Sequence, residues 1–155
     1  MMSGGTGTLT KGSTQMGKYF LDANFIVAIF REIEENNELA VSTCEDLLSN
    51  HECYISNLVF NEIITILMMR TKDMDLTARA YYFLKDNMTV INEHGIDRFN
   101  EKVFALFKKY NSKSFKVGFT DCSIAFIYKY YNLDYIVTFD RNFKVFDDVR
   151  LLKMQ

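Results

Sequence analysis

The fold is decided by the stretch Phe119-Thr-Asp121-Cys-Ser-Ile-Ala-Phe-Ile-Tyr-Lys-Tyr-Tyr-Asn-Leu-Asp-Tyr-Ile-Val-Thr138-Phe-Asp140-Arg-Asn-Phe143. Asp121 opens an apolar helix, where the helix dipole favours a carboxylate. A turn follows at residues 132–134, and Tyr135–Thr138 is typical of a buried strand with Asp140 just past its carboxyl end. Ligands bind at that edge of an open α/β sheet, so a single helix–strand unit brings two acids to it.

Strands and helices alternate outward from this stretch, which predicts an α/β fold with a parallel sheet between helices on both faces. Asp22 follows the first strand, and Asn24 is either a helix cap or a second polar group at the same edge. Helices are expected to about Glu34, over Val41–Ser49, from Ser56 or Asn57 to about Thr71, and over Asp75–Asn87 and Arg98–Tyr110. Strands are expected at Lys18–Leu21, Cys53–Ser56, Met88–Ile91 and Tyr135–Thr138, with Leu151-Leu152 as a short last strand.

A chain of 155 residues with 14 Phe and 9 Tyr predicts one domain with an aromatic core. No apolar run reaches the roughly 18 residues of a membrane span, and no signal peptide stands at the start, so we expect a soluble, cytoplasmic protein. Residues 1–17 are rich in Gly, Ser and Thr, which indicates a flexible leader, either native or derived from cloning. The domain is expected over residues 18–155.

The three cysteines do not indicate a disulfide framework or a zinc site. Cys44, His51 and Cys53 lie close in sequence, but their spacing matches no structural zinc motif and a fourth ligand is missing. Three unrelated core or surface residues are the better interpretation.

Glu62 is the sharpest anomaly of the chain. It lies in the second turn of a helix that is apolar nearly all round, and such a helix is expected to be buried. A charge there is costly unless it is paired, bound to a metal or at the edge of a cleft. The alternative is that Glu62 emerges on a narrow solvent-exposed stripe.

Four acids therefore stand out by position: Asp22, Glu62, Asp121 and Asp140. A doubly wound sheet brings them to one edge, where four carboxylates stay ionised at pH 7 only beside a cation. Ligation by oxygen alone suits Mg²⁺ or Mn²⁺, and such ions can activate water against a phosphodiester. Taken singly, each acid has another explanation, as a turn residue, a helix cap or a surface residue.

Other catalytic classes fit the sequence poorly. Two histidines without a partnered serine make a Ser-His-Asp site weak. A phospho-receiver domain needs an acidic pair at its first strand, and a haloacid-dehalogenase-like phosphatase needs Asp-x-Asp there. The sequence has Asp22-Ala23-Asn24 at that position, which lacks the second acid.

Four segments in this order resemble the PIN-domain ribonucleases, close to the VapC-type toxins of prokaryotic toxin–antitoxin pairs. The segments are Leu21-Asp22-Ala23-Asn24, Ile55-Ser56 with Asn61-Glu62-Ile63, Thr120-Asp121-Cys-Ser-Ile-Ala125, and Val137-Thr138-Phe139-Asp140 with Phe143. The resemblance covers roughly residues 19–152.

The resemblance implies a five-stranded parallel sheet and a set of metal ligands made of Asp22, Glu62, Asp121 and Asp140. It makes Asn24 and Thr138 supporting polar residues. It implies metal-dependent hydrolysis of RNA that leaves a 5′-phosphate, inhibition by a small antitoxin protein, and a homodimer. Two alternatives stay open: a PIN nuclease in RNA processing or quality control, and a PIN-like module that binds RNA or protein without cutting.

Charge is uneven along the chain although the net charge is only −2. The segment from Lys102 to Thr120 carries lysines and no acid, so its loop residues Lys113 and Lys116 are candidate phosphate contacts. A solvated helix face and loop explain the same residues equally well.

Overall fold

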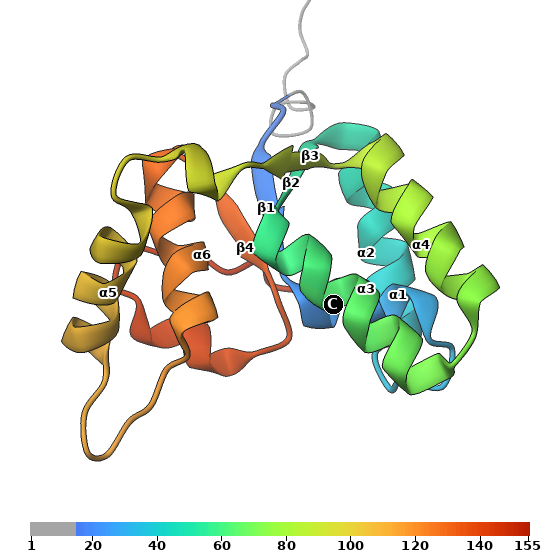
Figure 1. The fold of residues 1–155 in the computed structure, drawn as a ribbon. Helices are drawn as coiled ribbons and strands as arrows, with labels where there is room; N and C mark the ends of the chain where they lie inside the picture. The colour runs from blue at the N-terminus through green and yellow to red at the C-terminus, as the bar shows by residue number, and fades with distance from the viewer. Residues whose placement is uncertain (1–14) are drawn as a thin grey trace, which may run out of the picture.

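The structure is a computed structural model, and it describes residues 15–155. Strands and helices alternate along the chain as expected (Figure 1). The strands are β1 (Lys18–Leu21), β2 (Glu52–Ser56), β3 (Thr89–Ile91) and β4 (Tyr135–Val137). The helices are α1 (Ala23–Phe30), α2 (Asn37–Asn50), α3 (Asn57–Thr71), α4 (Met74–Asn87), α5 (Phe99–Tyr110) and α6 (Phe119–Tyr130), with short 3-10 helices at Glu93–Gly95 and Arg141–Val145.

The sheet is parallel and has the strand order β3-β2-β1-β4. It has four strands within the described residues, so the expectation of a fifth strand is wrong. Leu151 forms only one parallel bridge with Ile136, because the final apolar run is two residues long and Arg150 and Lys153 flank it.

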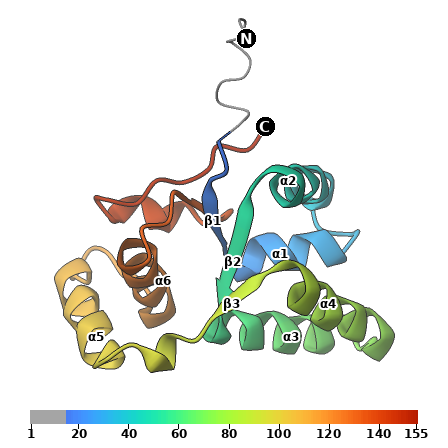
Figure 2. The same cartoon turned by 90° about the horizontal axis from the view of Figure 1, so that it is seen from above.

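Helices cover both faces of the sheet, which gives the expected three layers. Helices α1 to α4 lie on one side, and α5 and α6 lie on the other (Figures 1 and 2). The chain steps outward from β1 through β2 to β3 and then returns to place β4 on the free side of β1. Because crossovers between parallel strands are right-handed, this reversal places α5 and α6 on the opposite face from α1 to α4. The point of reversal lies between β1 and β4, where α/β folds bind their ligands.

The core lies where the central strands meet the helices. Phe20, Ile55 and Ile136 in the strands are fully buried, as are Phe25 in α1 and Ile124 in α6. Each such side chain contributes about 1.5 to 3 kcal/mol on burial. The neighbouring β1 and β4 are therefore held firmly, and the residues that follow them keep a fixed spacing.

Several element ends differ from the expected ones. Helix α6 begins at Phe119, two residues before Asp121, and α2 begins at Asn37 rather than Val41. Helix α3 is less buried than its composition predicts, since it buries only Val59, Ile63 and Leu67 completely. It packs between α1 and α4 in an outer layer, which leaves part of its apolar surface exposed.

The segment assigned to a leader falls mostly on residues 1–14, outside the described part. Gly17 belongs to the described residues, and its backbone N–H donates to His51 Nδ1 at 2.9 Å. Its carbonyl oxygen accepts from the Glu52 N–H, so the chain is already fixed against β2 one residue before β1 begins.

Across residues 15–155, each helix is too short or too polar to span a bilayer.

Candidate functional site

All four acids singled out by position line one cleft at the carboxyl edge of the sheet. The cleft has a volume of about 220 Å³. Asp22 and Asp140 reach it from the ends of β1 and β4, Glu62 from α3, and Asp121 from α6. The structure thus brings together side chains that are far apart in the sequence.

Asp22 is the most enclosed of the four acids, with 7% of its surface exposed. It is the N-cap of α1, where its Oδ1 accepts the Ala23 N–H at 2.8 Å. Its Oδ2 accepts the Thr138 hydroxyl at 2.8 Å. Burial raises the pKa of Asp22, the two hydrogen bonds act against that rise, and the charge of Asp140 adds to it.

Thr138 connects the ends of the two central strands. Besides donating to Asp22, its Oγ accepts from Asn24 Nδ2 at 3.2 Å and from the Asp140 N–H at 3.0 Å. Asn24 Oδ1 accepts the Phe139 N–H at 3.1 Å. Asn24 is therefore the second polar group at the edge rather than a helix cap, and Asp22 takes the capping role.

Asp140 is held by the 3-10 helix that follows it. Its Oδ1 accepts the Asn142 N–H at 2.9 Å, so Asp140 caps the segment Arg141–Val145. Since its own N–H bonds to Thr138, both its backbone and its carboxylate have fixed positions beside Asp22.

Asp121 and Glu62 face the cleft from helices on opposite sides of the sheet. Burial, and then the charges of Asp22 and Asp140, raise the pKa of Asp121 to about 6. Burial, and then the charge of Asp22, raise the pKa of Glu62. Glu62 lines the cleft and is itself exposed, so it lies both at the edge of a cleft and on the solvent-exposed side of α3.

The donor set fits a hard divalent cation. None of the ion pairs between residues 15 and 155 involves any of these acids, and each acid whose pKa shifts is shifted by the charge of another. Uncompensated carboxylate oxygens at one point are the ligands that Mg²⁺ and Mn²⁺ prefer. In the same part of the chain, no three His, Cys, Asp or Glu side chains are arranged as metal ligands, although the four acids line one cleft.

The other candidates from the sequence lie away from this cleft. Lys113 and Lys116 are exposed on the loop between α5 and α6 and do not line it. Cys44 and Cys53 are buried free thiols, and burial raises their pKa values to about 11 and 12. His51 Nδ1 accepts the Gly17 N–H at 2.9 Å.

Sequence reasoning missed two charged residues of the cleft and the charged residue that caps α3. Arg70 and Glu34 also line the cleft, and Arg70 was detectable because it follows Glu62 by two helical turns on α3. Glu93 is 1% exposed, and its two carboxylate oxygens accept the N–H groups of Asn57 and Leu58 at 2.9 Å each. Glu93 caps α3 although it lies 35 residues beyond Leu58 in the sequence, so no local sequence pattern predicts this cap.

The family model for the PIN domain matches residues 19–149, which is most of the chain. The chain belongs to the PIN-domain family. The four segments quoted from the sequence, from Leu21 to Phe143, lie within the matched range, so the resemblance on which they rested is confirmed. No curated protein matches this PIN domain in sequence.

Solved structures similar to this PIN domain include toxins of the VapC type. Mycobacterium tuberculosis VapC20, a toxin that cleaves the sarcin–ricin loop, has a TM-score of 0.68 at 17% identity over 81% of this chain and 92% of its own. Rickettsia felis VapBC2, bound to a DNA fragment of its promoter, has a TM-score of 0.69 at 19% identity over 89% and 99%. VapBC-1 of nontypeable Haemophilus influenzae has a TM-score of 0.63 at 19% identity over 87% and 96%. At these identities the similarity shows the fold.

Proposed function

We propose that this PIN domain is a metal-dependent endoribonuclease that hydrolyses RNA phosphodiester bonds. The observation that carries the proposal is the single cleft lined by Asp22, Glu62, Asp121 and Asp140. Burial and the charges of neighbouring acids raise the pKa values of Asp22, Glu62 and Asp121, and none of the four acids forms an ion pair within residues 15–155. A cation bound among these carboxylates would favour their charged forms and offset their mutual repulsion.

Asp22, Asp121 and Asp140 would hold one or two Mg²⁺ or Mn²⁺ ions, with Glu62 as a further ligand directly or through water. When bound, such an ion supplies acidification of a water molecule and neutralisation of charge on the phosphate. Thr138 and Asn24 keep the carboxylate of Asp22 oriented through their hydrogen bonds. Partners of this kind fix a ligand and tune its basicity.

Lys113 and Lys116 remain candidates for contact with the RNA backbone. Both are exposed on the loop that leads into α6, the helix of Asp121. A flexible lysine pair at this place would contribute affinity that falls with salt. We retain them as a proposal separate from the four acids.

We further propose that the protein is the toxin of a type II toxin–antitoxin pair and acts as a cytoplasmic homodimer. Several solved structures with this fold contain a VapC toxin together with its VapB antitoxin. Apolar side chains on α3 and α4 are exposed, among them Met69 at 71% and Tyr82 at 60%. This surface would accept a segment of a small antitoxin, whose basic side chain would enter the acidic cleft.

The test is cleavage of a mixed pool of single-stranded and structured RNA with Mg²⁺, with Mn²⁺ and with EDTA. Wild type is compared with Asp121→Asn and with Asp148→Asn, an exposed acid paired with Lys129 outside the cleft. The proposal predicts cutting that requires metal, yields 5′-phosphate ends, and is lost only in Asp121→Asn. Binding of RNA without cutting of any member of the pool would favour a non-catalytic module.

A further inference from the structure

Two basic pockets adjoin the acidic cleft. The first, here called the arginine pocket, has a volume of about 550 Å³ and lies between the ends of α1 and α3 and the start of α4. Arg31, Arg70 and Arg79 line it, with Glu32 as its only acid. Arg70 also lines the acidic cleft, so the two hollows share a wall.

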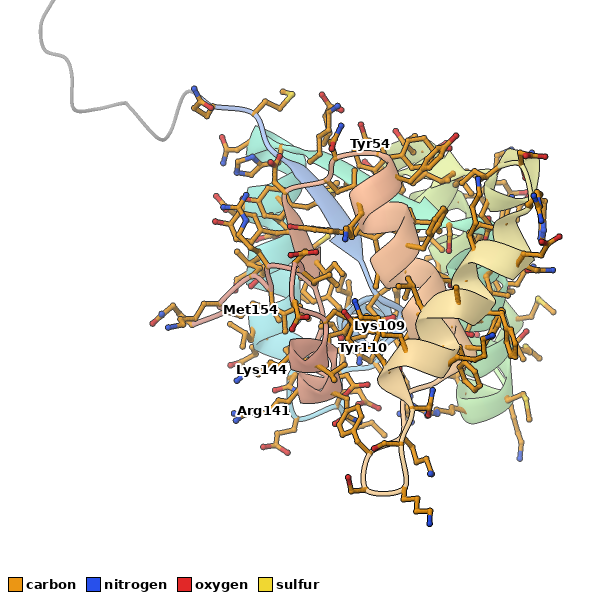
Figure 3. All side chains as sticks on the ribbon, turned by 90° about the vertical axis from the view of Figure 1, so that its left-hand side faces the viewer. Tyr54, Lys109, Tyr110, Arg141, Lys144 and Met154 are labelled. Atoms are coloured by element: carbon orange, nitrogen blue, oxygen red, sulfur yellow. The ribbon has the colours of Figure 1, made fainter. Side chains whose placement is uncertain are left out.

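The second, here called the C-terminal pocket, has a volume of about 510 Å³ and lies between the start of α2, the end of β4 and the last residues of the chain. Arg141, Lys144 and Lys153 line it, together with Asp140, which also lines the acidic cleft. Figure 3 shows Arg141 and Lys144 extending from the short 3-10 helix on the same side of the molecule, below Met154.

Most of these cations are not neutralised by the protein. Arg31 pairs with Glu34, but no ion pair among residues 15–155 involves Arg70 or Arg79 in the first pocket. The same holds for Arg141, Lys144 and Lys153 in the second. Arginine and lysine that line a concave surface without a carboxylate partner are suited to phosphate, which arginine binds through its fork of N–H groups.

The position of Arg70 distinguishes a phosphate bound in the arginine pocket from the phosphate expected at the four carboxylates. Arg70 follows Glu62 by eight residues on α3, which places their backbones about 12 Å apart along the helix. A phosphate bound by Arg70 on the side of the arginine pocket would therefore lie beside the carboxylates and not at them. In the C-terminal pocket, Arg141 directly follows Asp140, so cations flank the acids from both of these walls.

We propose that a single-stranded RNA backbone crosses the acidic cleft from the arginine pocket to the C-terminal pocket, with one flanking phosphate at Arg70 and Arg79 and another at Arg141 and Lys144. The acids repel phosphate by themselves, and the two pockets offset that repulsion on either side of the cut site. This proposal specifies how the RNA would lie across the proposed nuclease site, and it rests on the proposed nuclease function. It differs from a path over the loop of Lys113 and Lys116, which line none of these three hollows.

Binding of a fluorescein-labelled single-stranded RNA of mixed sequence tests the path. All proteins carry Asp121→Asn so that the RNA stays intact, and fluorescence anisotropy is measured in MgCl₂ over a series of KCl concentrations. The pocket variants are Arg70→Gln with Arg79→Gln, and Arg141→Gln with Lys144→Gln. Lys85→Gln is the matched control, since Lys85 shares α4 with Arg79 but lies over the Tyr81 ring outside the pockets.

Each pocket pair is expected to weaken binding about tenfold and to flatten the slope of log K against log salt by about 0.7 for each phosphate that the variant no longer binds. Lys85→Gln should leave both unchanged. Circular dichroism of each variant establishes that it is folded before its affinity is compared.

Three outcomes would overturn the path. They are unchanged affinity and slope in both pocket pairs, weaker binding confined to one pocket, and weaker binding found only in Lys113→Gln with Lys116→Gln. Failure of the nuclease proposal is recognised separately, by wild-type protein that binds this RNA and cuts none with Mg²⁺ or Mn²⁺. A result in which the pocket pairs weaken binding supports the path even then.

Discussion

The Thr138 hydroxyl donates to Asp22 Oδ2 at 2.8 Å, across a sequence separation of 116 residues. Both groups are buried, with 8% and 7% of their surfaces exposed. This bond joins the ends of β1 and β4 at the point where the strand order reverses. It also opposes the rise in the pKa of Asp22 that burial causes, so it favours the anionic form of this buried carboxylate.

Thr138→Val tests that role because it keeps the side-chain shape and removes the hydroxyl. The nuclease rate is expected to fall about 10- to 100-fold, and the free energy of unfolding by about 1 to 3 kcal/mol. Because the pKa of Asp22 rises further without its donor, the acid limb of the pH–rate profile should move to higher pH. Thr138→Ser restores the donor and should return the limb to its wild-type position.

An unchanged acid limb in Thr138→Val would contradict this role. A lower rate at every pH would then reflect a structural contribution alone.

Asp121 gives the fold a predictable dependence on pH in the absence of metal. Its folded-state pKa of about 6 exceeds its ordinary value of 3.8. Between pH 3.8 and 6, the folded protein therefore binds more protons at Asp121 than the unfolded chain does. The contribution of Asp121 to the free energy of unfolding is fully present below about pH 4 and is lost as pH rises through 6. Since Asp22 and Glu62 shift in the same direction, they add to the loss.

Asp121→Asn should therefore stabilise the metal-free protein at pH 7.5, on the order of 1 to 2 kcal/mol after allowance for solvent screening. The gain should disappear below pH 4, where the wild-type carboxyl is protonated in both states. Urea unfolding in EDTA at several pH values measures it. A variant less stable than wild type at pH 7.5 would show that the acids do not repel one another as described.

Glu93 predicts a stability effect separate from the chemistry of the site. Both its oxygens accept backbone N–H groups at the start of α3, the helix that carries Glu62. Glu93→Gln replaces one acceptor by a donor, so one buried N–H loses its partner at a cost of about 1 to 3 kcal/mol. Chemical denaturation should show this loss, and Glu101→Gln, whose side chain is 65% exposed, should change stability by less than about 0.5 kcal/mol. Equal stability of the two variants would contradict the capping role of Glu93.

Much of the fold was predictable because its periodicities are local. The short apolar runs before Asp22 and Asp140 predicted strands, and helical spacing predicted the helices α1 to α6 between them. The fifth strand failed because Leu151 and Leu152 are apolar enough to suggest a strand but too few to form a ladder. The prediction that α3 is buried all round was wrong. The composition shows that the helix is apolar, but only tertiary contacts decide which of its sides is covered.

The gathering of the four acids was predictable for a topological reason, since carboxyl ends of parallel strands share an edge. The bond from Thr138 to Asp22 and the cap from Glu93 to α3 were not, because both depend on distant segments meeting at hydrogen-bond distance. Arg70 was overlooked although helical spacing places it on the face of Glu62. A search for charged residues two turns from a candidate ligand would have found it.

The central claim is that the carboxylates of the acidic cleft form a metal site. Titration with Mn²⁺ at pH 7.5, with the heat of binding measured by calorimetry, tests it most directly. Wild type and Asp148→Asn should bind Mn²⁺ with equal affinity, and bound metal should raise the unfolding temperature. Asp22→Asn and Asp121→Asn should each lose at least about tenfold in affinity. Equal Mn²⁺ affinity in all four folded proteins, or no binding by wild type, would contradict the account.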